Sequence, residues 1–418
     1  MAKKFSRIGM LSTHGYFDPV PVLGRTDTGG QVVYVLELAK YIAKTGCKVD
    51  IFTRWFDRTK PQIDPVPGHK NVNIIRIPAS NWEFIPKERI YDILGELGEN
   101  MLEFIRQHEW EYDLFHGHYV DAGIVCLEVA RKLNKASFFT AHSLGAWKRQ
   151  QMGGDPVEME KKFNFRHRIA EELRIFKSVN AQSVTSIIQR EKINELYDFF
   201  ADNIVDIPPG VDVHTYRPSK GEKKPKKIKL PKKYIYCISR IDTNKGHDFL
   251  LKAFDLVRKE VDDVDLVIGG GSPNPKYREE EVFDMIEKII SDRGMEGRVH
   301  IIGYVPDELM APYYRHAEFF VLPSLFEPFG MTTQEAMACG TPVIASKFGG
   351  IRNAIENGVD GMLVDPSDEK EFAGVMLELL KNEEQRKNLG QQAYETVQNK
   401  FSWEAIAERF LQFYRDFI

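Results

Sequence analysis

The residues best suited to chemistry lie in the last third of the chain, in residues 322–340, LPSLFEPFGMTTQEAMACG. The apolar residues before this segment and at its start predict a strand. Gly330 then precedes a predicted helix that has Glu335 in its first turn. Glu335 suits a ribose diol, and Glu327 suits sugar hydroxyls. Either glutamate alone would fit a helix cap or a solvated loop, but the pair around a Phe-Gly turn is more specific. Free N–H groups at a helix N-terminus bind anions, so a diphosphate is expected on Phe329, Gly330, Met331 and Thr332.

A second motif, residues 239–246 (SRIDTNKG), directly follows an apolar strand-like run. Arg240 offers a planar fork and Lys245 a compact charge, and together they could neutralise a diphosphate leaving group. Cleavage of the bond between a phosphate and a sugar carbon needs nearby positive charge, because negative charge builds on the leaving oxygen. Two such cations in a polar loop are more often surface residues, but their place at a strand end favours function.

Two glycine motifs also follow predicted strands. Gly29 and Gly30 would let a donor lie against the backbone, with Gln31 beside them. Neither Gly-x-Gly-x-x-Gly nor a P-loop is present, so dinucleotide and ATP sites of those kinds are unsupported. Gly270, within residues 269–271, either faces the nucleotide or only turns the chain.

Histidines end two further predicted strands. His142, in TAHSLG, could bond a donor-sugar hydroxyl, with a structural histidine as the alternative. His116 and His118, beside Tyr119, have a spacing that could ligate zinc, but a third ligand is missing, so acceptor contact or packing is preferred. Asp263 and Asp265 have metal-binding spacing at the wrong end of a strand and are interpreted as solvated charge. We expect no required cofactor and no essential Mg²⁺.

The motifs are positioned by an alternation of strands and helices that predicts parallel sheets covered by helices. A lysine-rich, proline-containing stretch at residues 218–233 interrupts the alternation and is interpreted as a connector rather than a polyanion-binding tract. The expected fold class is therefore α/β, with two doubly wound, Rossmann-like domains facing a cleft. Residues 1–212 form the first domain, 213–233 the linker and 234–400 the second domain. An aromatic-rich helix at 401–418 is expected to pack back across the junction, with a membrane-surface helix as the alternative.

Composition limits the classes of partner. The 418 residues carry a net charge of −4, which argues against nucleic acid or anionic lipid as the main partner. No segment approaches the length of a membrane span or of a signal peptide, so no stable membrane insertion is expected. Four scattered cysteines indicate buried, reduced thiols. We therefore expect a cytoplasmic protein, whose oligomeric state the sequence does not specify.

These motifs together resemble the retaining GT-B glycosyltransferases, over nearly the whole chain. The resemblance implies that Glu327 contacts the donor sugar and Glu335 the ribose, and that Arg240 and Lys245 hold the diphosphate. It also implies that His142 approaches the sugar from the other domain. The implied activity is hexose transfer with retention of configuration, by front-face attack assisted by the leaving phosphate and without a protein nucleophile.

Within that family, the runs STHGY (12–16), FIPKE (84–88) and HSLGAWKRQQM (142–152) resemble synthases that act on fructose 6-phosphate. This likeness implies a nucleotide-sugar donor and a sugar-phosphate acceptor, with GDP-mannose favoured as donor and mannosylfructose phosphate as product. The alternative is UDP-glucose as donor with sucrose phosphate as product, or a related sucrose-synthase-like transferase with an unphosphorylated acceptor. A non-catalytic nucleotide-sugar-binding protein is a remote alternative. Arg166 and Arg168, two apart on a helix, should point differently, and Arg168 is favoured. The expected acceptor residues are Gln31, Lys87, Tyr119, Lys148, Arg166 and Arg168, with Arg149 also considered.

Overall fold

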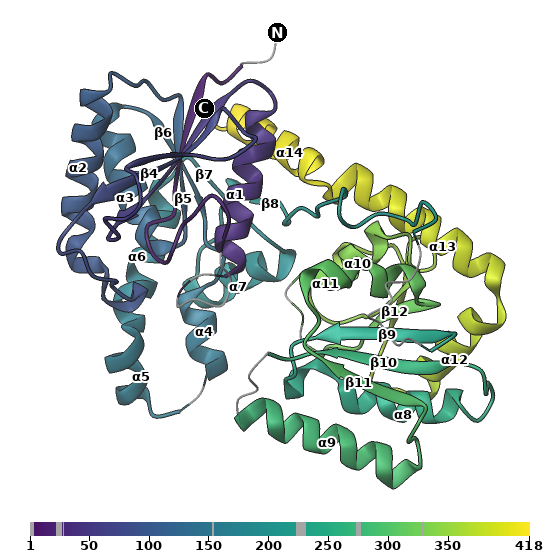
Figure 1. Ribbon diagram of the computed structural model, residues 1–418. Helices are drawn as coiled ribbons and strands as arrows, with labels where there is room; N and C mark the ends of the chain where they lie inside the picture. Colours follow the sequence, from purple (N-terminus) through teal and green to yellow (C-terminus); the bar gives the residue numbers. More distant parts are fainter. Residues whose placement is uncertain are drawn as a thin grey trace. The chain divides into compact units, whose positions relative to one another are not determined.

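The chain folds into two compact units in a computed structural model (Figure 1), which describes residues 4–418 except 22–26, 28, 153, 223–230, 273–276, 326 and 328. Unit 1 comprises Met1–Gly210 and Trp403–Ile418, and unit 2 comprises Val211–Ser402. Each unit is built on a parallel sheet, which confirms the predicted α/β class. The division falls at Gly210, whereas the sequence analysis placed it after residue 212. Part of the predicted linker, residues 223–230, lies outside the described residues.

The sheet of unit 1 has the order β3-β4-β2-β1-β5-β6-β7-β8, and every pair is parallel except β3 with β4. The direction of winding reverses between β1 and β5, so the loops after these two strands meet at a topological switch point. The sequence analysis did not predict β3, β7 or β8. The strands are β1 (Arg7–Leu11), β2 (Lys48–Trp55), β3 (Ile63–Pro65), β4 (Val72–Pro78), β5 (Leu114–His118), β6 (Ala136–Thr140), β7 (Ala181–Val184) and β8 (Ile204–Asp206).

Helices connect the parallel strands of unit 1, and several begin with a side-chain cap. Asp155 accepts hydrogen bonds from the first turn of α5, with Pro156 at the first helical position, and Ser186 caps α7. The helices are α1 (Gly30–Ala43), α2 (Leu94–Gln107), α3 (Val120–Leu133), α4 (Gly145–Met152), α5 (Pro156–Phe163), α6 (Phe165–Ser178), α7 (Ile187–Tyr197) and α14 (Trp403–Asp416), with short turns η1 (Lys87–Arg89) and η2 (Tyr91–Ile93).

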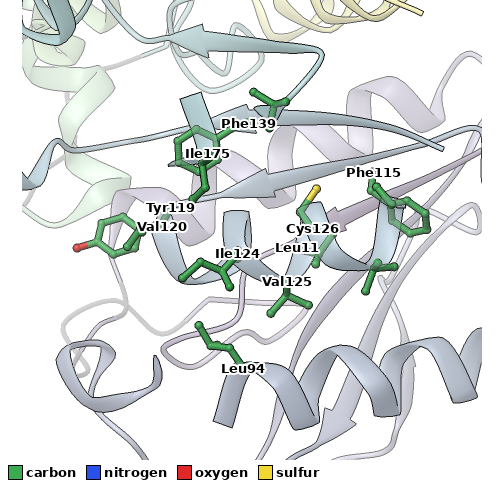
Figure 2. Close-up of a cluster of buried hydrophobic side chains, with 14 of the residues drawn as sticks. Leu11, Leu94, Phe115, Tyr119, Val120, Ile124, Val125, Cys126, Phe139 and Ile175 are labelled. Carbon is green, nitrogen blue, oxygen red and sulfur yellow. The ribbon is translucent and has the colours of Figure 1, made fainter. Parts of the chain in front are cut away.

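Two hydrophobic clusters cover the two faces of this sheet. Phe115 and Phe139 pack on one side with residues of α2, α3 and α6, as Figure 2 shows for part of the cluster. Their chain neighbours Leu114 and Phe138 pack on the other side with α1 and α14. Because successive side chains of a strand point to opposite faces, both faces of the sheet are buried, as a parallel sheet requires. Tyr119 lies at the end of the first cluster, and its hydroxyl points away from the other labelled side chains (Figure 2).

The last helix, α14, belongs to unit 1 although it follows unit 2 in sequence. It lies beside α1 (Figure 1), and Phe410 and Tyr414 are fully buried in the same cluster as α1. The apolar face that a membrane-surface helix would need is therefore buried in the core of unit 1. In the part of the chain that the structure describes, no helix is both long and apolar enough to cross a membrane.

The sheet of unit 2 has the order β11-β10-β9-β12-β13-β14 and is parallel throughout its described pairs. Its winding reverses between β9 and β12, which defines a second switch point. The strands are β9 (Tyr234–Ser239), β10 (Asp265–Gly270), β11 (Val299–Gly303), β12 (Phe319–Leu322), β13 (Val343–Ser346) and β14 (Met362–Val364). The helices are α8 (His247–Val257), α9 (Tyr277–Arg293), α10 (Asp307–His316), α11 (Met331–Ala338), α12 (Glu369–Lys381) and α13 (Glu383–Thr396), with short η3 (Thr243–Lys245) and η4 (Gly350–Asn353) and the π-helical turn η5 (Val397–Phe401).

The four cysteines are free and buried. Burial raises the pKa of Cys47, Cys126, Cys237 and Cys339 to about 12. A thiol with so high a pKa is protonated at neutral pH and is a poor nucleophile. All four thiols, Cys339 included, are therefore unsuited to nucleophilic catalysis.

Candidate active site

In unit 2, the two motifs predicted to grip a donor meet at the switch point. Lys245 ends the loop after β9, and Glu327 lies in the loop after β12. Lys245 Nζ donates to Glu327 Oε2 at 2.7 Å, and the two side chains are only 5% and 18% exposed. A hydrogen bond to a partner so nearly buried fixes the direction of the lysine side chain. The lysine and glutamate predicted from separate motifs therefore act as one group.

Glycines hold the loops of this switch point close together. Gly246, with φ of +70°, packs so tightly that a Cβ would lie 2.2 Å from the carbonyl oxygen of Pro323. Gly349, with φ of +85°, would place a Cβ 2.5 Å from the carbonyl oxygen of Glu327, and the N–H of Gly350 donates to that oxygen at 2.8 Å. The sequence analysis missed this second glycine pair, although a Gly-Gly directly after β13 was a signal of close approach.

The N-terminus of α11 has the geometry expected of an anion site. Gly330 is its N-cap in the left-handed region, with φ of +79°, and its N–H donates to Glu327 Oε1 at 3.2 Å. Met331 and Thr332 begin the helix, and Met331 is exposed. Phe329 is half-buried beside them. The positive end of the helix dipole therefore lies at the end of a parallel strand, as diphosphate binding requires.

Glu335 lies in the second turn of α11, which corrects the prediction of the first turn, because the helix begins only at Met331. Its Oε2 accepts a hydrogen bond from Tyr314 Oη at 2.9 Å. Burial raises the pKa of Glu335 to about 7, with the hydrogen bonds of Tyr314 and Tyr216 opposing the rise and Asp307 adding to it. The carboxyl group is thus poised to change charge near neutral pH.

Buried polar atoms without a partner gather around the same strand ends. Among the described residues, they include Asn244 Oδ1 before Lys245, Ser324 Oγ after β12, and Thr333 Oγ1 and the amide of Gln334 on α11. Buried polar groups are normally hydrogen-bonded. So many orphaned atoms within reach of one switch point indicate groups that a bound ligand or its waters would satisfy.

Arg240 and Gly270 are the remaining residues predicted on the donor side, and Asp263 and Asp265 lie in the same unit. Arg240 is exposed at the end of β9, and no ion pair of its guanidinium occurs among the described residues. Gly270, with φ of +132°, approaches the backbone so closely that a Cβ would lie 1.9 Å from Ser239 O, so packing alone already requires a glycine there. Asp263 pairs with exposed Lys233, whereas Asp265 is part-buried between Arg298 and His300, which corrects its interpretation as solvated charge.

In unit 1, three histidines form a connected row: His116 and His118 belong to β5, and His142 follows β6. His142, in the left-handed region with φ of +56°, shares a hydrogen bond of 3.0 Å between its Nε2 and His118 Nδ1. His118 stacks on His116, which bonds Tyr414 Oη and Thr140 Oγ1. Burial lowers the pKa of His142 and of His116 to about 3, so these rings are neutral. His116 and His118 serve packing, and the described residues include no cluster suited to a metal ion.

Several acceptor-side predictions lie near the switch point between β1 and β5. Gln31 donates from its amide to Ser12 Oγ and to the carbonyl oxygen of His118, both at 3.2 Å. Lys87 is paired with Asp27 through both its side chain and its backbone N–H. Gly29 and Gly30 are exposed, and a Cβ on either would meet no atom within 4 Å. Open space at both glycines is consistent with room for a ligand.

Arg168 is buried in an ion pair rather than free. Its Nε donates to Glu172 at 2.8 Å, its Nη2 donates to Ser143, and its guanidinium lies 4.6 Å from the centre of the Tyr119 ring. Arg166 is exposed, so the two arginines point differently, as predicted. Both Arg166 and Arg149 line an open cavity of about 500 Å³ bordered by α4, α5 and α6.

Lys148, another expected acceptor residue, is a half-buried cation. Burial lowers its pKa, and the nearby charges of Arg168 and Lys87 lower it further, opposed by Glu88 and Asp27. Cations that lower the pKa of a lysine lie within electrostatic reach of it. The structure therefore brings Lys87, Lys148, Arg168 and Tyr119 into one neighbourhood and leaves Arg166 at its exposed side.

A buried trio of Thr13, His14 and Asp121 lies at the same switch point. Asp121, in the first turn of α3, accepts hydrogen bonds from Thr13 Oγ1 and from His14 Nδ1, the latter at 2.9 Å. His14 also meets the edge of the Tyr119 ring, with centroids 4.8 Å apart. Thr13 and His14 lie in the loop after β1, and Asp121 lies three residues after the end of β5, so the strand-end rule applies to these residues as well, although it does not show that they pair.

Two α/β units, each with a parallel sheet and with candidate ligand-binding loops at its switch point, are the architecture of the GT-B glycosyltransferases. The chain belongs to the family described as glycosyl transferases group 1, which matches residues 219–396, while the description Glycosyltransferase Family 4 matches residues 28–215. It is accordingly a retaining hexosyltransferase, as the sequence predicted.

Individual relatives extend the likeness over nearly the whole chain. A mannosylfructose-phosphate synthase of Agrobacterium fabrum is 35% identical over 98% of this chain and 91% of its own length. A D-inositol 3-phosphate glycosyltransferase of Corynebacterium glutamicum is 31% identical over 99% of this chain and 97% of its own. Among solved structures, a sucrose-phosphate synthase from Thermosynechococcus elongatus has a TM-score of 0.75 at 29% identity, covering 98% of both chains.

Proposed function

We propose that the enzyme transfers mannose from GDP-mannose to fructose 6-phosphate and so makes mannosylfructose phosphate. The observation that carries the choice of acceptor is Lys148, whose pKa is lowered first by burial and further by repulsion from the charges of Arg168 and Lys87. A phosphate dianion would relieve that repulsion and accept charge-assisted hydrogen bonds. The 35% identity to a mannosylfructose-phosphate synthase supports the same acceptor and favours the mannosyl donor.

On the donor side, we assign the diphosphate to Lys245, Arg240 and the N-terminus of α11. Positive charge from a lysine, an arginine and a helix dipole can stabilise the leaving diphosphate without a metal ion, so neither Mg²⁺ nor another cofactor is required. Glu327 then contacts the sugar and Glu335 the ribose. On the acceptor side, His142 approaches the transferred sugar, and Gln31 and Tyr119 border the acceptor.

A second candidate is sucrose-phosphate synthesis from UDP-glucose. It is favoured by the similarity to the solved sucrose-phosphate synthase, at 29% identity over 98% of both chains. Both candidates share the acceptor and differ in the donor's base and hexose. For either, we assign the reaction to the cytoplasm, because free buried thiols are typical of reducing compartments.

The test is release of nucleotide from GDP-mannose, UDP-glucose and ADP-glucose, each with fructose 6-phosphate, fructose or inositol 3-phosphate, and each with and without EDTA. We expect release with GDP-mannose and fructose 6-phosphate, unaffected by EDTA, and an α-linked product by NMR. Release only from UDP-glucose would replace the donor assignment. Equal turnover with fructose would refute the role of the cation group, and no turnover with any pair would refute transfer itself.

A further inference from the structure

Two tyrosine hydroxyls reach the carboxyl group of Glu335, the residue assigned to the ribose. Tyr314 Oη donates to Glu335 Oε2 at 2.9 Å, and Tyr216 donates to the same carboxyl group. Tyr314 belongs to α10 and Glu335 to α11, whereas Tyr216 lies in the segment between β8 and β9. The proposed function gives neither tyrosine a role.

Tyr314 is held rigidly by the residues around it. Its side chain is fully buried, and its ring meets the rings of Tyr236 and Phe320 edge-on, with centroids 5.5 and 5.4 Å apart. Its backbone carbonyl oxygen accepts a hydrogen bond from Thr341 Oγ1 at 2.8 Å. A side chain packed in this way keeps one rotamer, so its hydroxyl is a donor with a fixed direction.

Tyr216 is held through the backbone on both sides of it. Arg315 follows Tyr314 in α10. Its Nε donates to the carbonyl oxygen of Arg217 and its Nη2 to that of Thr215, both at 2.7 Å. These carbonyl groups flank Tyr216, whose ring centroid lies 6.1 Å from that of Tyr314. The last turn of α10 therefore positions both phenol groups.

The two tyrosines leave part of the Glu335 carboxylate free to accept hydrogen bonds. A carboxylate has about four lone-pair sites, and each phenol donates one hydrogen. About two sites then remain, which is the number that the two hydroxyls of a ribose require. Glu335 is only half-buried, so a ligand can reach it. Two fixed donors also set the plane of the carboxylate and hence the direction of the remaining lone pairs.

We propose that Tyr314 and Tyr216 position Glu335 for the ribose, so that the site selects ribonucleotides over deoxynucleotides. This inference rests on the proposed function and adds to it the residues that set the selectivity for the sugar of the nucleotide. Neither tyrosine touches the ribose, because each acts through Glu335. A sugar without these hydroxyls gains nothing from a well-directed carboxylate.

Binding of nucleoside diphosphates to the full chain, measured by titration calorimetry without acceptor, tests the inference. GDP and UDP are each compared with their 2′,3′-dideoxy forms, and the pair that binds more tightly is used for the variants. The wild type should bind the ribose form at least about tenfold more tightly, because it adds charge-assisted hydrogen bonds. Tyr314→Phe keeps the ring and removes the hydroxyl. It should weaken binding of the ribose form about fivefold, the effect of one hydrogen bond, and leave the dideoxy form within about twofold.

Tyr313→Phe is the matched control. Adjacent residues of a helix point in different directions, and the ring of Tyr313 stacks on that of Tyr236, with centroids 5.2 Å apart. This variant removes a hydroxyl from the same helix and should leave both affinities within about twofold. Thermal unfolding of each variant measures a loss of stability separately from the preference for ribose.

Each outcome decides a different claim. If Tyr314→Phe leaves both affinities unchanged, or weakens the ribose and dideoxy forms equally, the inference is wrong, because a merely structural role does not distinguish the two forms. Equal binding of the two forms by the wild type, or binding of neither, would overturn it as well. If Tyr314→Phe does not fold, Tyr216→Phe tests the same selection, and an unchanged preference for ribose would refute the proposal. If the expected binding is found but no donor and acceptor pair gives turnover, the positioning role stands and the proposed transfer fails.

Discussion

Raising the pH from 6 to 8 should strengthen binding of the nucleotide-sugar, because Glu335 has a pKa of about 7. A carboxylate accepts the two hydroxyls of a ribose better than a carboxylic acid does, since charge-assisted hydrogen bonds are the stronger ones. With that pKa, about a tenth of the groups are ionised at pH 6 and about nine tenths at pH 8. If only the ionised form binds, the donor KM should fall by up to about tenfold over this range.

The same group makes a prediction about stability that does not depend on the activity. Its pKa in the folded chain is raised above the usual value of 4.5, so the stabilisation it contributes is fully present below pH 4.5 and is lost as the pH rises through about 7. Between pH 5 and 8 the wild-type free energy of unfolding should fall by about 2–3 kcal/mol from this residue alone. Glu335→Gln, which cannot titrate, should remove that part of the fall.

The assays are donor KM at saturating acceptor and urea unfolding, each at pH 6 and 8, on wild type and Glu335→Gln. A matched control is Glu308→Gln, which removes a carboxylate from the first turn of α10 and should leave both pH dependences unchanged. A donor KM that varies equally in wild type and Glu335→Gln would refute the ribose role. Equal pH dependence of unfolding would refute the raised pKa.

Further substitutions probe the charged pairs. Lys245→Met should abolish most turnover and, by leaving Glu327 nearly buried and unpaired, should cost about 2 kcal/mol of stability in urea unfolding; wild-type stability would show that the pair is not formed. Arg168→Ala should lower stability by about 3 kcal/mol, since it strands the buried carboxylate of Glu172, and an unchanged melting temperature would contradict this. Lys148→Met should raise the KM for fructose 6-phosphate at least about tenfold but leave that for fructose unchanged, and equal effects on both acceptors would contradict a phosphate contact.

Much of the fold could be predicted because its strands are short apolar runs in a strict alternation with helices. The strands that were not predicted lack an apolar run: β7 buries the polar Gln182 and Ser183, and β3 and β8 are only three residues long with at most one buried residue. Which side chains pair with one another was harder to predict from the sequence. Lys245 and Glu327 are 82 residues apart, and only the adjacency of β9 and β12 brings them together. By contrast, the burial of Arg168 could have been inferred, because Glu172 lies one helical turn further along α6.

The place of α14 in unit 1 has a consequence for the order in which the enzyme is made. A ribosome releases the strands of unit 1 first and then the whole of unit 2, and only afterwards Tyr414, whose hydroxyl bonds His116 2.7 Å away. His116 stacks on His118, which in turn bonds His142. Until the final helix emerges, one face of the first sheet is covered only in part, by α1, and His116 lacks its bond to Tyr414. Nascent chains therefore carry an incomplete first unit until the last helix has been made.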